Sequence, residues 1–315
     1  MQDLRKDGRR HRGGVIRAGG TGAPGEAGGG LGRAIGGGIM ATTALPDVEP
    51  VTTRIGAILG GVDLTHPLDP ESVRRIRRAV LDHGVVFLRG QMISREQMLA
   101  FMANFGTLSP DPMAVQQDVP AAEAIMDIPT LAYRQATSVW HSDSTLAEMP
   151  ASLIALRPLE LPDVGGDTCW GDMYSAYEAL SEPLRALLDR LTAVHSAAKV
   201  MPLMNGAGYG PLQEAMRAVH PVVRVHPETG RKALFVNELW TEAIVELSPA
   251  EGKAVLALLY EHVKSPEFAM RWRWRLGDIA LWDNRSTQHY ALRDYDAMRV
   301  MEKSILAGDR PYGPN

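Results

Sequence analysis

Short apolar runs separated by polar turns fill the chain from residue 151 onward, a pattern typical of closely spaced strands. Two longer stretches interrupt it. One predicts a helix over about residues 173–191, and the other begins at Ser248, where Pro249 and Glu251 supply a first-turn proline and a capping box. Many short strands with a few helices packed outside predict a mainly β fold, a jelly roll with α-helical additions. We expect its strands at residues 151–156, 167–170, 192–196, 219–226, 233–236, 268–275, 279–282 and 299–306.

The part of the chain before these strands alternates strands with helices. A helix is expected from Pro70 to Gly84, because proline suits a first helical position and glycine ends a helix well. A second helix runs through Met102 from a capping box formed by Ser94 and Gln97. The expected strands of this part are a pair broken by glycines at 51–62 and a short buried strand at 85–88.

Two further stretches have unusual composition. Arg and Trp alternate over residues 271–275, which favours a two-faced strand with Trp in the core and Arg in solvent over a nucleic-acid stacking surface. Residues 199–218 hold three glycines and two prolines and predict a mobile loop, of a length that often serves as a lid.

The first 46 residues differ in kind from the rest. They hold seven Arg or Lys against three acidic residues, and 14 of the chain's 31 glycines fall before Ala41. So little apolar periodicity predicts disorder. We therefore expect residues 1–46 to be a Gly/Arg-rich extension, with Met40 the true start, and residues 47–315 to be one catalytic domain.

Charge and cysteine content limit the class of partner and the cellular compartment. The whole chain carries a net charge of −4, so removing the +4 of the extension leaves −8 on the body, which argues against nucleic acid and for a small-molecule partner. Cys169 is the only cysteine, so no intrachain disulfide can form, and a reducing compartment such as the cytoplasm is expected. No apolar run approaches the roughly 20 residues of a membrane span. A homo-oligomer is left open.

Residues 138–145 hold the pair that suggests chemistry. On a strand, His141 and Asp143 would point to one face, because side chains alternate with a period of two. His289 is the best candidate for a third ligand, since it follows a buried strand and a polar stretch that could turn toward a pocket. Two His and one Asp are typical of non-haem Fe(II) sites. A chance pair in a polar loop is the alternative for the His-x-Asp spacing alone.

Three more residues suggest anion binding. Thr168 enters a strand after a turn that contains Gly165 and Gly166, and its hydroxyl could donate inward. Arg299 begins the last apolar strand, where an inward guanidinium needs an anion to offset its desolvation. Lys303 lies on the same face, so two anionic groups are nearby or Lys303 forms a salt bridge to a carboxylate such as Asp111. An ordinary turn and a surface arginine are the alternatives.

Together these motifs resemble the taurine dioxygenase family, over about residues 55–311 and in a consistent order. The resemblance rests on Trp-His-x-Asp at 140–143, Gly-Gly-Asp-Thr at 165–168, Val-His-Pro-Glu-Thr-Gly-Arg at 225–231, Phe-Val-Asn-Glu at 235–238, Trp-Asp-Asn-Arg-x-Thr-Gln-His-Tyr at 282–290, and Arg299.

This resemblance implies a double-stranded β-helix and an Fe(II)- and 2-oxoglutarate-dependent dioxygenase. Decarboxylation of 2-oxoglutarate to succinate, with O₂ as the second cosubstrate, would be coupled to oxidation of a small organic substrate, most simply its hydroxylation. It implies that His141, Asp143 and His289 hold iron and that Thr168 and Arg299 bind the distal carboxylate of 2-oxoglutarate. A planar guanidinium matches a carboxylate with two hydrogen bonds.

The chain departs from the family where the substrate binds. A His and an Arg grip sulfonate in the enzyme that gives the family its name, and Asp111 and Lys303 stand at the matching positions, while Thr137, Ser144 and Trp240 also differ from it. Asp111 would repel a sulfonate, so alkyl sulfates, other sulfonates, aryloxyalkanoates and carboxylated natural products all stay open. Desaturation or epoxidation in a tailoring pathway, or a non-catalytic binding jelly roll, are the alternative functions.

Overall fold

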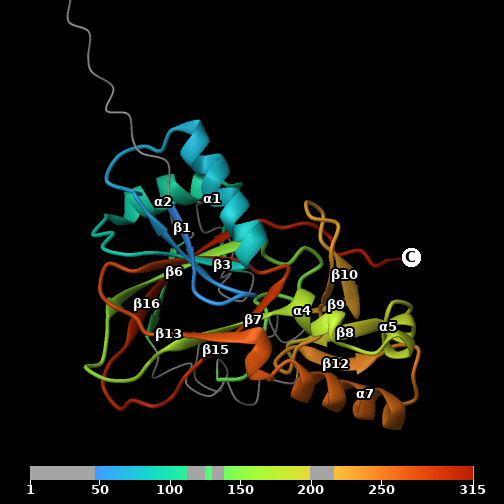
Figure 1. The fold of residues 1–315 in the computed structure, drawn as a ribbon. Helices are drawn as coiled ribbons and strands as arrows, with labels where there is room; N and C mark the ends of the chain where they lie inside the picture. The colour runs from blue at the N-terminus through green and yellow to red at the C-terminus, as the bar shows by residue number, and fades with distance from the viewer. Residues whose placement is uncertain (1–46, 112–124, 130–137, 199–215, 315) are drawn as a thin grey trace, which may run out of the picture. The chain divides into compact units, whose positions relative to one another are not determined.

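The computed structural model describes residues 47–111, 125–129, 138–198 and 216–314 (Figure 1). The expected extension at residues 1–46 lies outside them, as does most of the expected lid at 199–218, so both stay predictions.

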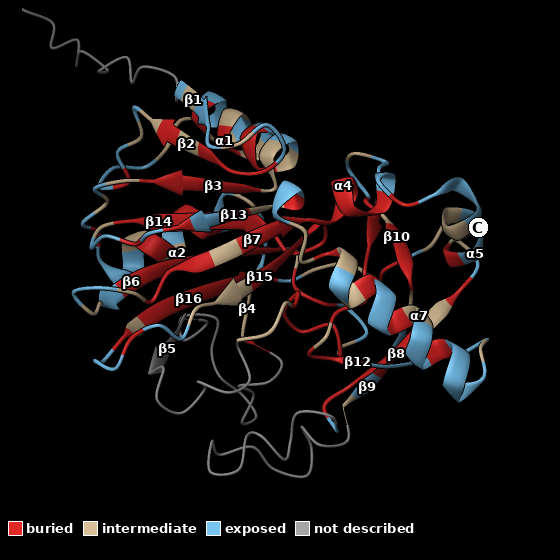
Figure 2. Ribbon diagram, turned by 60° about the horizontal axis from the view of Figure 1, so that its bottom comes forward, coloured by how far each residue is buried: buried red, intermediate tan, exposed pale blue. Residues whose placement is uncertain are grey.

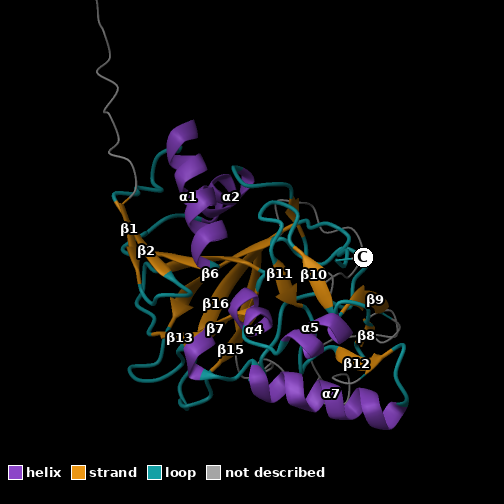
Figure 3. Ribbon diagram, turned by 45° about the vertical axis from the view of Figure 1, so that its right-hand side comes forward, coloured by secondary structure: helices purple, strands orange, loops and turns teal. Residues whose placement is uncertain are grey.

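Strands outnumber helices in the described chain (Figure 3). The strands are β1 (Asp47–Pro50), β2 (Ala57–Gly60), β3 (Val85–Leu88), β4 (Leu108–Ser109), β5 (Ile125–Pro129), β6 (Leu153–Glu160), β7 (Thr168–Asp172), β8 (Thr192–Ser196), β9 (Arg217–Pro221), β10 (Val223–Val225), β11 (Lys232–Leu234), β12 (Thr241–Ile244), β13 (Ala269–Trp272), β14 (Ile279–Asp283), β15 (Thr287–Ala291) and β16 (Val300–Leu306). The helices are α1 (Pro70–His83), α2 (Arg95–Ala103), α4 (Met173–Glu178), α5 (Glu182–Leu188) and α7 (Pro249–His262), with the short 3-10 turn η3 (Pro266–Phe268).

Two sheets form the body of the fold. The larger has eight strands in the order β1-β2-β3-β14-β6-β16-β4, with β5 also paired to β16. The smaller has three strands in the order β13-β7-β15. One hydrophobic cluster combines side chains of both sheets, for example Phe87, Trp170, Trp282 and Met301. The two sheets therefore face each other across a shared core, and the predicted mainly β jelly roll is confirmed.

Helices α1 and α2 cover the opposite face of the large sheet (Figure 1). Alternation along β3 explains how: Val85 and Phe87 point into the core between the sheets, whereas Val86 and Leu88 contact the cluster that includes Ile76 of α1. Every strand residue of β3 is thus buried (Figure 2).

A second group of elements packs around its own hydrophobic cluster. This cluster takes side chains from α4, α5, α7, β8, β10, β11 and β12 (Figure 3). Strands β12-β8-β9 form one small sheet, and β10 pairs with β11.

The helix boundaries match the capping signals. Asp69 caps α1, Gly84 ends it, and Ser94 forms both hydrogen bonds of the α2 capping box. The single helix expected at 173–191 is wrong, because the chain forms α4 and then α5. Pro183 lies in the first turn of α5, and a proline there has no N–H to continue a preceding helix.

Three strand predictions also need correction. The first strand of the N-terminal pair lies at residues 47–50, before the expected range. The strand expected at 219–226 is interrupted, since Val222 bonds outside β9 and β10, to Leu191 and Phe235. Strands β4, β5, β12 and β15 were not expected at all. The alternation at 271–275 holds as predicted, with both tryptophans buried and the three arginines exposed, although β13 ends at Trp272.

No helix among the described residues is both long and apolar enough to span a membrane.

Candidate active site

The His-x-Asp stretch lies in a loop, and the expectation of a strand there is wrong. His141 forms a single antiparallel bridge with His289, and the chain then turns over the next residues. Ser144 has a positive φ of 60° within that turn. Because the chain turns here, the side chains of His141 and Asp143 lie close together although they are not in a strand.

His289 lies in β15, which returns from β14 through the turn at residues 284–286. Its N–H donates to His141 O at 2.8 Å, and the His141 N–H donates to His289 O at 3.1 Å. These two bonds hold the imidazole rings 4.1 Å apart between centroids. His141, Asp143 and His289 are buried, and each offers one ligand atom so that all these atoms lie within 4.8 Å of one another.

This cluster suits a divalent transition metal. Bond lengths of about 2.1 Å place the ligand atoms around one ion roughly 3–4 Å apart, so the observed spacing needs little adjustment. The Nδ1 atom of His289 is buried without a hydrogen-bond partner among the described residues. Two imidazoles and one carboxylate are the donor set of non-haem Fe(II) sites, which leave positions open for other ligands.

Several polar contacts fix the loop that carries His141 and Asp143. Asn284 Oδ1 accepts from the Asp143 N–H at 2.8 Å, and Asn284 Nδ2 donates to the carbonyls of Asp143 at 2.9 Å and Ala151 at 3.1 Å. Ser142 Oγ donates to Thr287 O at 2.7 Å. The side chain of Asn284 therefore replaces the strand pairing that the loop lacks. Its position inside the Trp-Asp-Asn-Arg motif was the signal that could have identified it.

The charge states follow from burial and from neighbouring groups. Burial, with a smaller effect of His141, lowers the pKa of His289 to about 3, so this imidazole is neutral. Burial alone would raise the pKa of Asp143, but the neighbouring Lys303 ammonium lowers it well below its usual range. The cluster thus presents a neutral ring and a charged carboxylate, the forms that bind metal.

Thr168 and Arg299 lie together beside the cluster. Trp170 pairs with His289 in the sheet and Thr168 pairs with Ala291, so Thr168 and His289 are diagonal neighbours, with Cβ atoms roughly 7 Å apart. Arg299 Nη2 donates to Thr168 Oγ1 at 3.3 Å, and both side chains are buried.

The Gly165-Gly166 turn makes room for this pair. Gly166 has a φ of +73°, and a Cβ there would lie 3.0 Å from Arg299 Cδ. A Cβ on Gly165, with φ +85°, would lie 2.5 Å from the backbone oxygen of Asp294. Both positions therefore require glycine.

The second cation, Lys303, is internally paired. Its Nζ lies 2.5 Å from Asp111 Oδ2 and 3.4 Å from Asp143 Oδ2, and all three side chains are at most 12% exposed. Burial would lower the pKa of Lys303, but Asp111 and Asp143 raise it, so the ammonium is charged. Of the two arrangements that the sequence left open for Lys303, the structure has the salt bridge to Asp111.

The other expected substrate residues are distributed as follows. Ser144 and Trp240 are buried, and Ser144 Oγ and Trp240 Nε1 have no partner within the described chain. Thr145 joins the two regions, because its Oγ1 accepts from Asn237 Nδ2 at 3.1 Å and the Trp240 N–H donates to Asn237 Oδ1. Thr137 lies outside the described residues.

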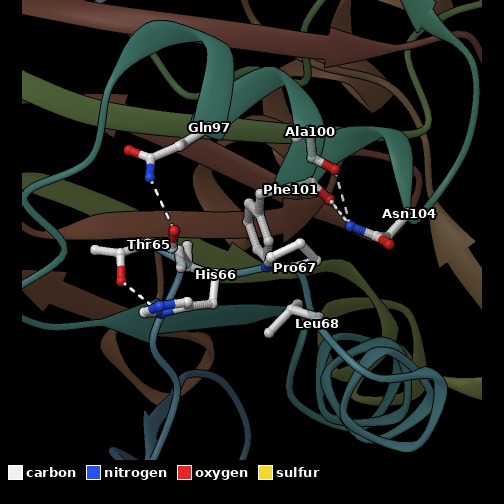
Figure 4. A pocket seen from close by; sticks show the side chains of 9 residues that line it. Thr65, His66, Pro67, Leu68, Gln97, Ala100, Phe101 and Asn104 are labelled. Atoms are coloured by element: carbon white, nitrogen blue, oxygen red, sulfur yellow. Dashed lines mark hydrogen bonds between the residues drawn. The ribbon is translucent and has the colours of Figure 1, made fainter. Parts of the chain in front are cut away.

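A separate pocket lies between α2 and residues 64–68 (Figure 4). Gln97 Nε2 donates to Thr65 O at 3.0 Å, and Asn104 Nδ2 donates to Ala100 O at 2.8 Å. None of the expected site residues lines this pocket. Gln97 and Asn104, at the two ends of α2, thus bond to backbone carbonyls, so these polar side chains have a structural role.

The fold and the buried cluster define a class of protein, the jelly-roll oxygenases with two His and one carboxylate as metal ligands. Comparison with known proteins identifies the family. Residues 47–304 match the model of the taurine catabolism dioxygenase TauD, TfdA family. The chain belongs to this family and is an Fe(II)- and 2-oxoglutarate-dependent dioxygenase that uses O₂.

Individual relatives align with more than 80% of this chain. An alpha-ketoglutarate-dependent sulfate ester dioxygenase of Pseudomonas putida is 38% identical over 279 residues, covering 85% of this chain and 91% of that protein. An alpha-ketoglutarate-dependent 2,4-dichlorophenoxyacetate dioxygenase of Cupriavidus pinatubonensis is 33% identical, covering 83% of this chain and 97% of that protein. The solved structure of AAD-2 in complex with Mn(II) and N-oxalylglycine has a TM-score of 0.74 at 30% identity, over 84% of this chain and 98% of that one.

Proposed function

We propose that His141, Asp143 and His289 hold the iron of this dioxygenase and that Thr168 and Arg299 bind the distal carboxylate of 2-oxoglutarate. The buried cluster of two imidazoles and one carboxylate carries the proposal. When bound there, Fe(II) supplies the oxidising chemistry that couples decarboxylation of 2-oxoglutarate to oxidation of the substrate.

The hydrogen bonds of His141 favour a ligand role. Its Nδ1–H donates to Val139 O at 2.8 Å, which fixes the tautomer and leaves the Nε2 lone pair on the side of Asp143, 3.5 Å from Oδ1. The bridge to His289 prevents the two rings from separating. The chain thus holds its ligands in position before any metal binds, which lowers the cost of binding.

Arg299 supplies the charge for the cosubstrate. Arg299 is 5% exposed, and burial lowers the pKa of its guanidinium, although Tyr295 and Asp167 partly oppose this. A carboxylate that entered the site would offset that desolvation with two parallel hydrogen bonds. Thr168 lies within hydrogen-bond distance of the same guanidinium and would donate its hydroxyl to the same anion.

The primary substrate is proposed to be a small organic anion that is hydroxylated, such as an alkyl sulfate, a sulfonate, an aryloxyalkanoate or a carboxylated natural product. The relatives named for sulfate esters and dichlorophenoxyacetate support this range. Ser144 and Trp240 would supply hydrogen-bond donors, and Thr137 is proposed as a further substrate residue. An anion could use Lys303 only by competing with Asp111 and Asp143 for the same ammonium.

The test is oxygen-dependent release of succinate from 2-oxoglutarate by the iron-loaded protein. We expect succinate in air and none under argon, with a faster rate when the correct anionic candidate is present. His289→Ala should abolish the release. A non-catalytic jelly roll would bind 2-oxoglutarate and release no succinate in either atmosphere. Mass spectrometry of the product separates hydroxylation, which adds one oxygen, from desaturation, which removes two hydrogens.

A further inference from the structure

Trp274 contacts Thr168, one of the two residues proposed to bind 2-oxoglutarate. Its indole Nε1–H donates to Thr168 Oγ1 at 3.0 Å, and both residues are buried. Trp272 pairs with Thr168 across β13 and β7. Trp274 follows two residues later, beyond the end of β13 but in the same hydrophobic cluster, with its ring packed edge-on to Trp170.

Two donors already bond to the hydroxyl oxygen of Thr168, so this hydroxyl can only donate to a further group. A hydroxyl has two acceptor lone pairs and one donor hydrogen. Trp274 Nε1 occupies one acceptor position, and Arg299 Nη2 occupies the other at 3.3 Å. With both acceptor positions filled by donors, the O–H of Thr168 must point away from the two nitrogens and donate to another group.

Packing alone does not account for this contact. The indole nitrogens of Trp170 and Trp282 in the same core are buried with no hydrogen-bond partner among the described residues. A tryptophan in this core therefore needs no hydroxyl beside its nitrogen, so the bond from Trp274 has a separate effect on Thr168.

We propose that Trp274 is a positioning residue for 2-oxoglutarate, which orients the Thr168 hydroxyl so that its hydrogen faces the distal carboxylate. Arg299 and Thr168 then both face that carboxylate with hydrogen-bond donors and present no acceptor to it. The proposal rests on the proposed function, because it requires that Thr168 and Arg299 bind this carboxylate.

Equilibrium calorimetry on the Mn(II)-loaded protein tests the proposal without turnover. Trp274→Phe should raise the Kd of 2-oxoglutarate about three- to tenfold, the effect of one lost hydrogen bond. Thr168→Val should raise it about tenfold or more, since its bond is to a charged group. In the Thr168→Val background, Trp274→Phe should add less than about twofold, because the hydroxyl that it orients is gone.

Two controls separate this effect from damage to the fold. Trp272→Phe removes a buried indole from β13, two residues before Trp274, but that indole donates to Asp278, so the Kd should stay within about twofold of wild type. Oxalate chelates a metal but has no distal carboxylate, so its Kd should be unchanged in every variant. Trp274→Tyr, which also lacks the indole N–H, replaces Trp274→Phe if the latter does not fold.

The outcomes are distinguishable. Equal losses for Trp274→Phe in the presence and absence of the Thr168 hydroxyl would overturn the positioning role, as would a parallel loss of oxalate binding. Thr168→Val protein that binds 2-oxoglutarate as tightly as wild type would instead refute the proposed carboxylate site. Wild-type protein that binds no Mn(II) would refute the proposed metal site.

Discussion

Replacing Lys303 by Met should destabilise the metal-free protein more than replacing Asp111 by Asn. Lys303 is buried between two carboxylates, Asp111 at 2.5 Å and Asp143 at 3.4 Å. In Lys303→Met, both carboxylates lose this cation. In Asp111→Asn, the ammonium keeps Asp143, and the new amide oxygen can still accept its hydrogen bond.

The magnitudes follow from this asymmetry. Removing one partner of a buried ion pair costs about 3–5 kcal/mol, and Lys303→Met should lie at the upper end because two carboxylates are affected. Asp111→Asn should cost about 1–3 kcal/mol, as for a weakened buried hydrogen bond. The double variant should be more stable than Lys303→Met alone, since it leaves one buried carboxylate at this position instead of two.

Urea unfolding in EDTA at pH 7.5 measures these free energies. Glu302→Gln is the matched control, because Glu302 is the neighbour of Lys303 in β16 and its buried carboxylate is paired with Arg157 and Arg95. Its cost should add to that of Lys303→Met, since the two side chains point to opposite faces. Additive costs of Lys303→Met and Asp111→Asn, or a larger cost for the latter, would refute the reasoning.

Four further predictions address other parts of the molecule. Arg299→Ala should weaken 2-oxoglutarate binding by about 2–5 kcal/mol and Lys303→Ala by less than about 1.4 kcal/mol, in anaerobic titrations of the iron-loaded protein followed by charge-transfer absorbance; equal losses would mean that the cations act as one site. Asn284→Asp should lower the free energy of unfolding by about 2–4 kcal/mol, since it loses two donated hydrogen bonds and buries a charge. Burial holds the pKa of His195 well below its usual value. As the pH falls below 6.5, the unfolded chain therefore binds a proton at this histidine that the folded protein does not bind. The free energy of unfolding falls accordingly. Between pH 7.5 and 5.5 the wild type should therefore lose about 1.4 kcal/mol more than His195→Gln, and equal losses would contradict this. Deleting residues 1–39 should leave activity and Tm nearly unchanged, and insoluble protein would show that the extension contributes to folding.

The sequence predicts helices best where a local signal fixes their ends. The caps at Asp69, Ser94 and Ser248 each satisfy backbone N–H groups with one side chain, so the signal lies within four residues. Strand pairing is not local in this way. Strand β15 pairs with β7, more than a hundred residues away, and its residues Thr287–Ala291 are polar enough to suggest a loop until the partner is known.

In the candidate site, too, the sequence shows the residue types but not the contacts that depend on the fold. The residue types at 141, 143 and 289 suggest a metal site from the sequence, but the reason for their convergence was mistaken, because the first two lie in a turn and not on a strand. The contact of Trp274 with Thr168 could not be expected either. The alternation at 271–275 predicts that the ring is buried, whereas the partner of its nitrogen depends on how β7 lies beside β13.

The convergence is explained by groups that are not ligands. A turn has no ladder of hydrogen bonds to hold it, yet a metal site needs its ligands fixed to within a fraction of an ångström. Here the main chain of His141 bonds directly to that of His289, and Asn284 bonds to both the N–H and the carbonyl of Asp143. All of these bonds come from the β14–β15 hairpin, which also carries His289. One hairpin therefore supplies one of the three proposed ligands and positions the other two. The separation of 146 residues between Asp143 and His289 becomes irrelevant once that hairpin has formed.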